Sequence, residues 1–142
     1  MLRAVLDSTI LVSAFLRQGG VSSDLLRQAY ERRFSFYLAD DILAETRRTL
    51  LESERIRNRY HYPDDSVEHF IQGLRRLANL INPLPPLSGI VRDPNDDMII
   101  ACACAASAAY LVTRDKDLLS LRVYDAVTIV SPEIFMETLR SQ

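Results

Sequence analysis

Acidic side chains recur at four points of this 142-residue chain from which they could act together. Asp7 follows one predicted strand, and Asp115 and Asp117 follow another. Asp96 and Asp97 lie at the start of a predicted helix, and Glu45 lies one turn into a second helix. Carboxylates gathered in one place repel one another, so such a cluster requires protons or a cation to compensate its charge. Oxygen ligands favour a hard divalent ion, and the predicted occupant is therefore Mg²⁺ or Mn²⁺.

Each of these acids also has an ordinary structural explanation. Asp7 alone is a typical N-cap for a following helix, and Asp96 and Asp97 suit the first turn of another. Glu45 alone fits an exposed helix surface, and residues 115–117 alone fit a polar turn. Only the joint placement of these residues favours a metal site over four separate local roles.

The hydrophobic pattern predicts the elements that bring these acids together. Strands buried on both faces appear as continuous apolar runs, and the segments that fit are 3–6, 34–39, 110–113 and 127–130, with a possible short edge strand at 80–84. Helical periodicity lies between them, at 8–17, 22–33, from Asp40 or Asp41 to 50, 63–80, 98–109, and from Ser131 onward. This alternation predicts an α/β domain with a parallel sheet joined by right-handed crossovers. The carboxyl ends of its strands meet at one edge, where the acids are expected to converge.

Composition indicates an ordinary globular protein, with 48% hydrophobic and 25% charged residues. Residues 1–142 are predicted to form a single domain. No apolar run is long enough to cross a bilayer and no signal peptide is visible, so a cytoplasmic protein without a membrane partner is expected. Cys102 and Cys104 point in different directions on a predicted helix, which favours two reduced core thiols over a disulfide or a metal site.

The segment 47–62 is the most basic part of the chain. It contains Arg47, Arg48, Arg55, Arg57 and Arg59, interleaved with Glu52 and Glu54 and followed by Tyr60 and Tyr62. The favoured interpretation is a solvated helix face held by ion pairs. A phosphate-binding patch is the alternative, since every basic residue except Lys116 is Arg, which suits bidentate phosphate contacts. The net charge of −2 adds no general attraction for nucleic acid.

Four segments taken in order carry a more specific signal. They are Val-Leu-Asp-Ser-Thr-Ile-Leu-Val-Ser-Ala at 5–14, Ile-Leu-Ala-Glu at 42–45, Asp-Pro-Asn-Asp-Asp-Met-Ile-Ile-Ala at 93–101, and Tyr-Leu-Val-Thr-Arg-Asp-Lys-Asp-Leu-Leu at 110–119. Together with the closing segment 130–135, they resemble the PIN (PilT N-terminal) domain family, and most closely the toxins of bacterial type II toxin–antitoxin systems. The resemblance implies a metal-dependent endoribonuclease built as a three-layer α/β/α sandwich around a central parallel sheet.

The resemblance also implies roles for individual residues. Asp7, Glu45, Asp97 and Asp115 match the four acids of the family, with Asp117 as an auxiliary acid and Thr113 as the hydroxyl before the fourth. Asp7, Asp97 and Asp115 are expected to hold one or two Mg²⁺ or Mn²⁺ ions, with Glu45 completing the shell or orienting water. Thr9 stands where the family usually has Asn or Ser, and its hydroxyl can still donate to a carboxylate.

An acidic pocket needs a basic rim to hold an RNA strand. The candidates for this rim are Arg47, Arg48, Arg92, Arg114 and Lys116. By resemblance, the expected partners are the RNA substrate, a small antitoxin protein and further copies of the chain in a homodimer or higher oligomer. A non-catalytic PIN-like module that binds RNA or protein is the alternative function.

Other phosphate chemistries fit the sequence less well. No Gly-rich loop follows the first strand, which argues against a dinucleotide or P-loop site. No Gly-x-Ser-x-Gly elbow supplies a hydrolase nucleophile. A receiver-type domain would need a phosphoacceptor Asp at the end of an internal strand, and none of the predicted internal strands provides one.

Overall fold

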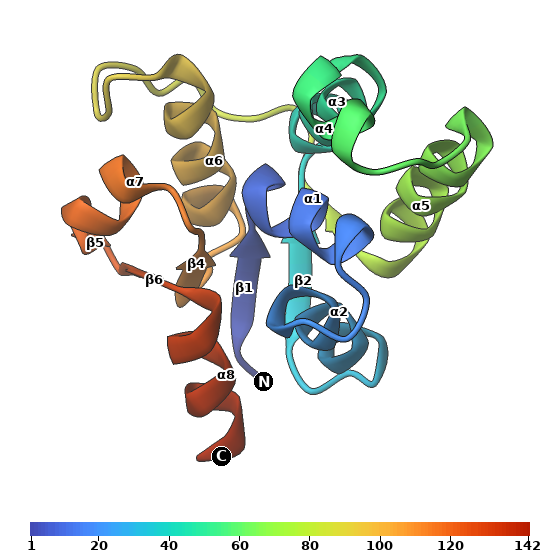
Figure 1. Cartoon of the computed structure of the whole chain (residues 1–142). Coiled ribbons are helices and arrows are strands. Elements are labelled where there is room, and N and C mark those ends of the chain that lie inside the picture. The colour runs from blue at the N-terminus through green and yellow to red at the C-terminus, as the bar shows by residue number, and fades with distance from the viewer.

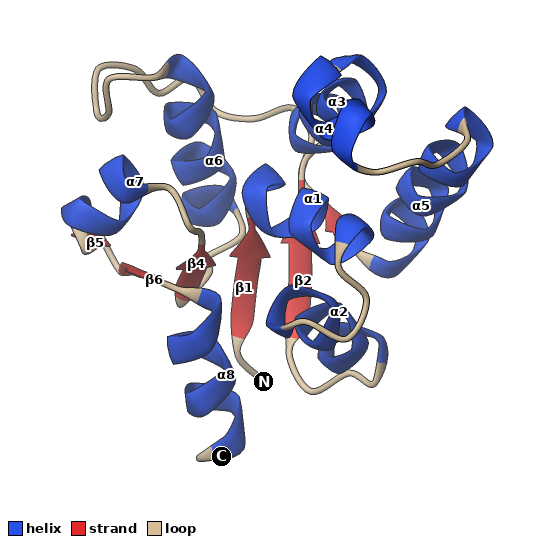
Figure 2. Cartoon of the chain, viewed as in Figure 1, coloured by secondary structure: helices blue, strands red, loops and turns tan.

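A six-stranded sheet with the strand order β3-β2-β1-β4-β6-β5 organises the protein, whose computed structural model describes residues 1–142 (Figures 1 and 2). The strands are β1 (Arg3–Leu6), β2 (Ser35–Leu38), β3 (Asn79–Leu80), β4 (Tyr110–Val112), β5 (Val123–Tyr124) and β6 (Val127–Val130). All neighbouring pairs are parallel except β5 and β6, which are antiparallel. The parallel sheet predicted from the sequence is therefore confirmed, and β5 is an addition that the pattern did not predict.

Helices flank this sheet and complete the predicted α/β/α sandwich (Figure 2). They are α1 (Ser8–Leu16), α2 (Val21–Tyr30), α3 (Asp40–Glu52), α4 (Glu54–Arg59), α5 (Asp64–Leu77), α6 (Pro94–Ala105), α7 (Lys116–Leu121) and α8 (Pro132–Arg140). Helix α6 contacts β1, β2 and β4, while α1 packs on α2 and α3, and α8 contacts β4 and α2. The helix α6 starts four residues before the predicted Met98, because the Asp93 side chain caps it and Pro94 suits its first turn.

The core explains why β1 appears in the sequence as an unbroken apolar run. Ala4, Val5 and Leu6 are fully buried, since β1 lies between β2 and β4 and beneath α6. Near the other end of the sheet, the rings of Phe34 and Phe135 meet edge to face at 5.1 Å and attach α8 to the core. Thirty buried side chains form one continuous cluster, and the last residues of β1 and β4 are anchored in it.

The carboxyl ends of β1 and β4 meet at one edge of the sheet, at the top of Figure 1. The Asp7 amide donates to the carbonyl oxygen of Val112 at 3.1 Å and extends the pairing just beyond both strands. Helices α1 and α7 start from this edge, directly after Asp7 and Asp115. The first and last acids of the predicted cluster therefore lie on neighbouring strand ends.

None of the helices combines the length and apolar character that crossing a membrane requires. Cys102 and Cys104 are both free thiols, as the sequence predicted. Cys102 is fully buried in α6, and burial raises the pKa of its thiol to about 12. It therefore behaves as a small apolar core residue.

Candidate metal centre

Asp7 lies at the centre of the acidic edge and is almost completely buried, with 1% of its surface exposed. Its Oδ1 accepts hydrogen bonds from the Thr9 hydroxyl at 2.5 Å and from the Ile10 amide at 3.2 Å. Its Oδ2 accepts a hydrogen bond from the Thr113 hydroxyl, so both predicted supporting hydroxyls contact this carboxylate. Asp7 is thus the N-cap of α1, as the ordinary interpretation expected, and is also held in a fixed orientation by two strand ends.

The environment of Asp7 disfavours its negative charge. Burial raises the pKa of this carboxyl group from its ordinary value of 3.8 to about 6, despite the opposing hydrogen bonds from Thr113, Thr9 and Ile10. The nearby charge of Asp115 raises the pKa further. A cation placed between these two carboxylates would reverse this effect, because it favours their ionised forms.

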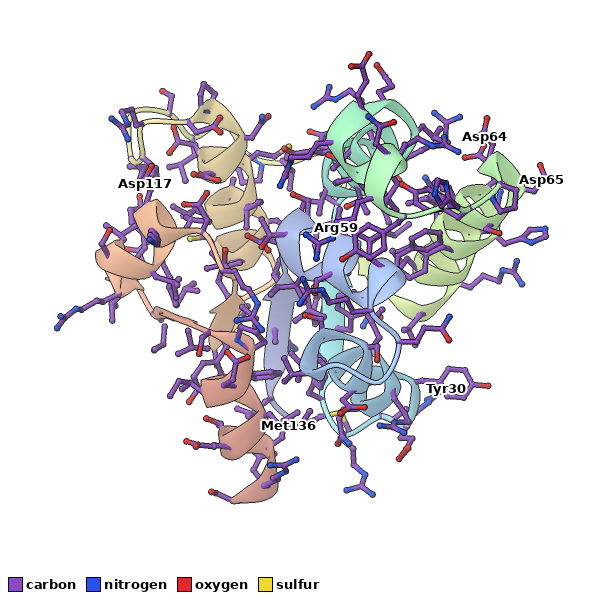
Figure 3. All side chains as sticks on the ribbon, in the orientation of Figure 1. Tyr30, Arg59, Asp64, Asp65, Asp117 and Met136 are labelled. Atoms are coloured by element: carbon purple, nitrogen blue, oxygen red, sulfur yellow. The ribbon has the colours of Figure 1, made fainter.

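Three further carboxylates come together beside Asp7. One oxygen each from Asp96, Asp115 and Asp117 lies within 4.8 Å of the other two. Burial, followed by the charges of Asp115, Asp93, Asp7 and Asp117, raises the pKa of Asp96 to about 7. Figure 3 shows Asp117 at the start of α7, on the side that faces the loop before α6. We call Asp96, Asp115 and Asp117 the acidic cluster.

The local structure around α7 explains the position of Asp115. Its Oδ1 accepts hydrogen bonds from the amides of Asp117, at 2.8 Å, and Leu118, at 3.3 Å, and so caps the helix. Its own amide donates to the Thr113 hydroxyl at 2.9 Å, the same hydroxyl that donates to Asp7. Thr113 therefore links the Asp7 carboxylate to the backbone of Asp115 and holds the ends of β1 and β4 together.

The structure places Asp96 in the acidic cluster, and not the neighbouring Asp97 to which the resemblance assigned the metal. Oδ1 of Asp97 accepts a hydrogen bond from the Val91 amide at 2.8 Å, which fixes the loop before α6. Successive helical residues point about 100° apart, so adjacent acids cannot face the same site equally. The rotation of α6 about its axis therefore decides which of the two acids faces Asp115, and in this structure it is Asp96.

Glu45 lies in α3, outside the acidic cluster but near the starts of α1 and α6. Its Oε2 is buried without a hydrogen-bond partner. Burial raises the pKa of Glu45, the charge of Arg48 lowers it, and the charge of Asp93 raises it again. The pKa is also lowered by a hydrogen bond with Ser8, the residue after Asp7, so Glu45 faces the same edge.

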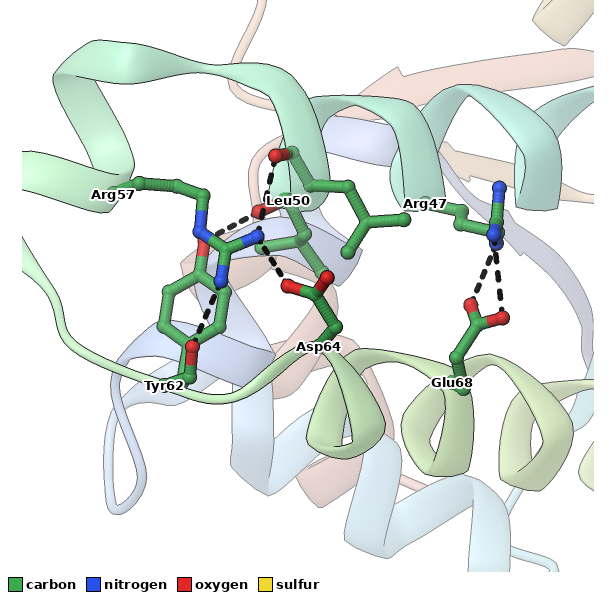
Figure 4. A network of polar contacts seen from close by, with 7 residues as sticks. Arg47, Leu50, Arg57, Tyr62, Asp64 and Glu68 are labelled. Atoms are coloured by element: carbon green, nitrogen blue, oxygen red, sulfur yellow. Dashed lines mark hydrogen bonds and ion pairs between the residues drawn. The ribbon is translucent and has the colours of Figure 1, made fainter.

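The five predicted basic residues fall into two groups. Arg92 lies 3.6 Å from Asp117, the charge of Arg48 lowers the pKa of Glu45, and Lys116 adjoins Asp115 in the sequence. Arg114 also adjoins Asp115, but its guanidinium donates two hydrogen bonds to Glu133 on α8, at 3.1 and 2.6 Å. Arg47 instead makes two hydrogen bonds to Glu68, at 2.6 and 3.2 Å, which join α3 to α5 (Figure 4). Its guanidinium therefore serves the packing of two helices.

The residues at this edge fit a hard divalent cation. Asp96 Oδ2 and Glu45 Oε2 are both buried without a hydrogen-bond partner, which is costly for a carboxylate oxygen unless something compensates it. The available donors are all oxygen atoms, and no His or Cys is among them. Such a donor set suits Mg²⁺ or Mn²⁺ and not a softer metal.

Several known proteins are similar to this chain in sequence or in fold. An uncharacterised protein of Methanocaldococcus jannaschii, MJ1680, is 27% identical over 121 residues, which are 85% of this chain and 76% of that protein. The solved structure of PAE2754 from Pyrobaculum aerophilum has a TM-score of 0.68 at 14% identity, covering 99% of this chain and 91% of that one. VapBC2 from Rickettsia felis, solved bound to a DNA fragment from its promoter, has a TM-score of 0.61 at 15% identity, covering 90% and 97%.

At 14% and 15% identity, the two solved structures show a shared fold but not a shared function. The family itself is shown by the model of the PIN domain, which matches residues 3–117. That match begins at β1 and ends at Asp117, so it contains Asp7, Glu45 and the complete acidic cluster. On this match, and as its motifs predicted, the chain belongs to the PIN domain family.

Proposed function

We propose that this protein is a metal-dependent ribonuclease that hydrolyses RNA phosphodiester bonds. The observation that carries this proposal is the acidic cluster, in which three carboxylates lie within 4.8 Å and a buried oxygen of Asp96 has no partner. Membership of the PIN family, whose members are generally nucleases, supports the same activity. The non-catalytic alternative gains no support from the site, because every acid at the edge is present.

In this proposal Asp96, Asp115 and Asp117 hold Mg²⁺ or Mn²⁺, with Asp7 adding charge beside them. When bound, such an ion supplies Lewis-acid stabilisation of the phosphate and lowers the pKa of water. Thr9 and Thr113 orient Asp7 through their hydroxyls. Glu45, with one unpaired oxygen and a raised pKa, is assigned to orient the attacking water.

The test compares the neighbouring acids Asp96 and Asp97. Purified full-length protein is incubated with structured and unstructured RNAs in Mn²⁺ or in EDTA, as wild type, Asp96→Asn and Asp97→Asn. We expect Mn²⁺-dependent cleavage that falls at least about 100-fold in Asp96→Asn, because a ligand is lost, and less in Asp97→Asn. Equal trace cleavage by wild type and Asp96→Asn would refute the ribonuclease. A larger loss in Asp97→Asn would refute the assignment of Asp96.

We also propose that the protein is the toxin of a type II toxin–antitoxin pair, with a small antitoxin as partner. The motifs at 5–14 and 110–119 resemble those of such toxins, and the fold is similar to that of VapBC2. Expression of the chain alone should arrest growth, and co-expression of the small protein encoded beside it should restore growth. Arrest by the wild type and by Asp96→Asn alike would contradict a toxin that acts through cleavage.

A further inference from the structure

A groove of about 400 Å³ starts at the acidic edge and runs between α1 and α4. Thr9, which donates to Asp7, and Arg114, which precedes Asp115, line the end nearest the acids. Arg17, Arg55 and Arg59 line the remainder. We call this feature the arginine groove, defined by Arg17, Arg55, Arg59 and Arg114. Its Thr9 and Arg114 end therefore adjoins Asp7 and Asp115, although no acid lines the groove itself.

The spacing of the basic residues in α4 explains why this groove is positive. Arg55 and Arg59 are four residues apart and so share one helix face, which lies toward Arg17. Figure 3 shows Arg59 reaching over α1. Arg57 lies on another face, where it contacts Asp64 at 2.7 Å and the carbonyl oxygen of Tyr62 at 2.9 Å (Figure 4).

The sequence predicted that ion pairs hold the arginines of segment 47–62. Within that segment, only Arg47 and Arg57 form salt bridges. Arg17, Arg55 and Arg59 form no salt bridge with any carboxylate of the chain, although all three are exposed. Arg114, at the acidic end of the groove, is paired with Glu133 at 2.6 Å. The other three arginines lie together without an acid and repel one another, and an anion in the groove relieves that repulsion.

An aromatic surface continues from the arginine groove. Tyr60 lines it, and the guanidinium of Arg59 lies 5.6 Å from the centre of the Tyr60 ring. A second cavity of about 630 Å³ shares Leu16 and Tyr60 with the groove. Its other lining residues include aromatic and imidazole rings, namely Phe15, His61, Tyr62, His69 and Phe70. Rings beside a basic track are suited to stacking on unpaired bases.

We propose that the arginine groove binds the backbone phosphates of single-stranded RNA beside the scissile phosphate, with a neighbouring base stacked at Tyr60. The inference rests on the proposed ribonuclease function and deepens it by naming the residues that hold the strand beyond the cleavage site. An acidic protein segment is the competing ligand for the same charges. RNA is favoured because one end of the groove adjoins Asp7 and Asp115 through Thr9 and Arg114, and its other end shares Leu16 and Tyr60 with the aromatic cavity. An acidic protein segment would not use the rings of that cavity for stacking.

The experiment measures binding without cleavage. Fluorescence anisotropy follows a labelled single-stranded RNA of about 12 nucleotides with the full chain in EDTA, over a series of salt concentrations. The variants are Arg55→Ala/Arg59→Ala and Tyr60→Ala, with Arg76→Ala as matched control, since Arg76 is exposed on α5 and lies outside both cavities. The exposed positions of Arg55 and Arg59 make these substitutions compatible with folding, which circular dichroism checks.

We expect the double variant to raise Kd at least 10-fold. The slope of log Kd against log salt should fall by about 1.4, because each lost phosphate contact in single strands contributes about 0.7. Tyr60→Ala should raise the Kd for RNA about 5- to 100-fold and change the Kd for an abasic oligonucleotide far less, since it removes a ring that can stack on a base and leaves every arginine of the groove in place. Arg76→Ala should change Kd less than about twofold.

Unchanged Kd and salt slope in the double variant would overturn the inference. So would tighter binding of poly-glutamate than of RNA at matched charge, which would identify a surface for an acidic protein segment. Cleavage in Mn²⁺ is measured on the same proteins. Cleavage that does not depend on the groove overturns the inference alone, whereas groove-dependent binding without any cleavage overturns the ribonuclease function and leaves the groove as an RNA site.

Discussion

Replacing Asp7 by Asn should make the metal-free protein more stable. Burial raises the pKa of Asp7 from 3.8 to about 6, so the folded chain disfavours the ionised carboxylate. One pKa unit is about 1.36 kcal/mol, and ionised Asp7 therefore lowers the free energy of unfolding by roughly 3 kcal/mol at high pH. Because the folded pKa is the higher one, this destabilisation is nearly absent at about pH 4, grows with rising pH and is complete above about pH 7.

Asn removes the charge and keeps one oxygen for the hydrogen bonds from Thr9 and Ile10. It loses the second acceptor for the Thr113 hydroxyl, at a cost of about 1 kcal/mol. We therefore expect the free energy of unfolding to rise by about 2 kcal/mol in EDTA at about pH 8. The corresponding rise in Tm is roughly 4–8 °C for a chain of this size, and the gain should disappear at about pH 4.

The assay is urea unfolding followed by circular dichroism in EDTA at the two pH values. The control is Glu137→Gln, which removes an exposed carboxylate on α8 and should change stability by less than about 0.5 kcal/mol. Added Mn²⁺ should stabilise the wild type more than Asp7→Asn. An Asp7→Asn variant less stable than the wild type in EDTA at about pH 8 would contradict this prediction. It would mean that the buried charge of Asp7 does not lower the free energy of unfolding, so a bound cation would have no such loss to offset.

Two further substitutions test the support of the site and the core. Thr113→Val removes the hydroxyl that donates to Asp7 and accepts from the Asp115 amide, so Mn²⁺ affinity measured by calorimetry should fall about 10- to 100-fold. Unchanged affinity would show that Thr113 does not orient the acids. Phe135→Ala removes a buried ring that lies 5.1 Å from Phe34 and 5.5 Å from Tyr110, and should lower the free energy of unfolding by about 3–5 kcal/mol. A loss below about 1 kcal/mol in urea would contradict that packing.

The buried central elements could be predicted because burial of their side chains leaves a short-range hydrophobic pattern in the sequence. Strand β6 has the predicted bounds, 127–130, and β1 ends at Leu6 directly before Asp7, as expected. Strand β5 and helix α7 escaped prediction because few of their side chains are buried, so their sequences carry little hydrophobic pattern. Val123 in β5 is 53% exposed, so it lacks the apolar burial that marks the central strands, and its pairing with Thr128 in β6 holds it in place.

The sequence predicted which edge of the sheet carries the acids, but not which individual side chains face one another there. Asp7 and Asp115 were placed correctly at neighbouring strand ends, because parallel strands end at the same side of a sheet. The choice between Asp96 and Asp97 depends on the rotation of α6 against that edge, which no residue spacing specifies. The arginine groove depends on Arg17 at the end of α1 meeting α4, a contact between segments about forty residues apart that no local pattern encodes.

The Thr9 hydroxyl has a consequence for when the protein acquires its proposed activity during synthesis. It donates to Asp7 and accepts a hydrogen bond from the Arg114 amide at 3.3 Å, joining residues 105 positions apart. A ribosome that has added Asp97 has already made Asp7, Glu45 and Asp96, but neither β4 nor the residues that close this bond. On the proposed function, we therefore expect the growing chain to gain activity only after Asp117 has been added and β4 has inserted beside β1.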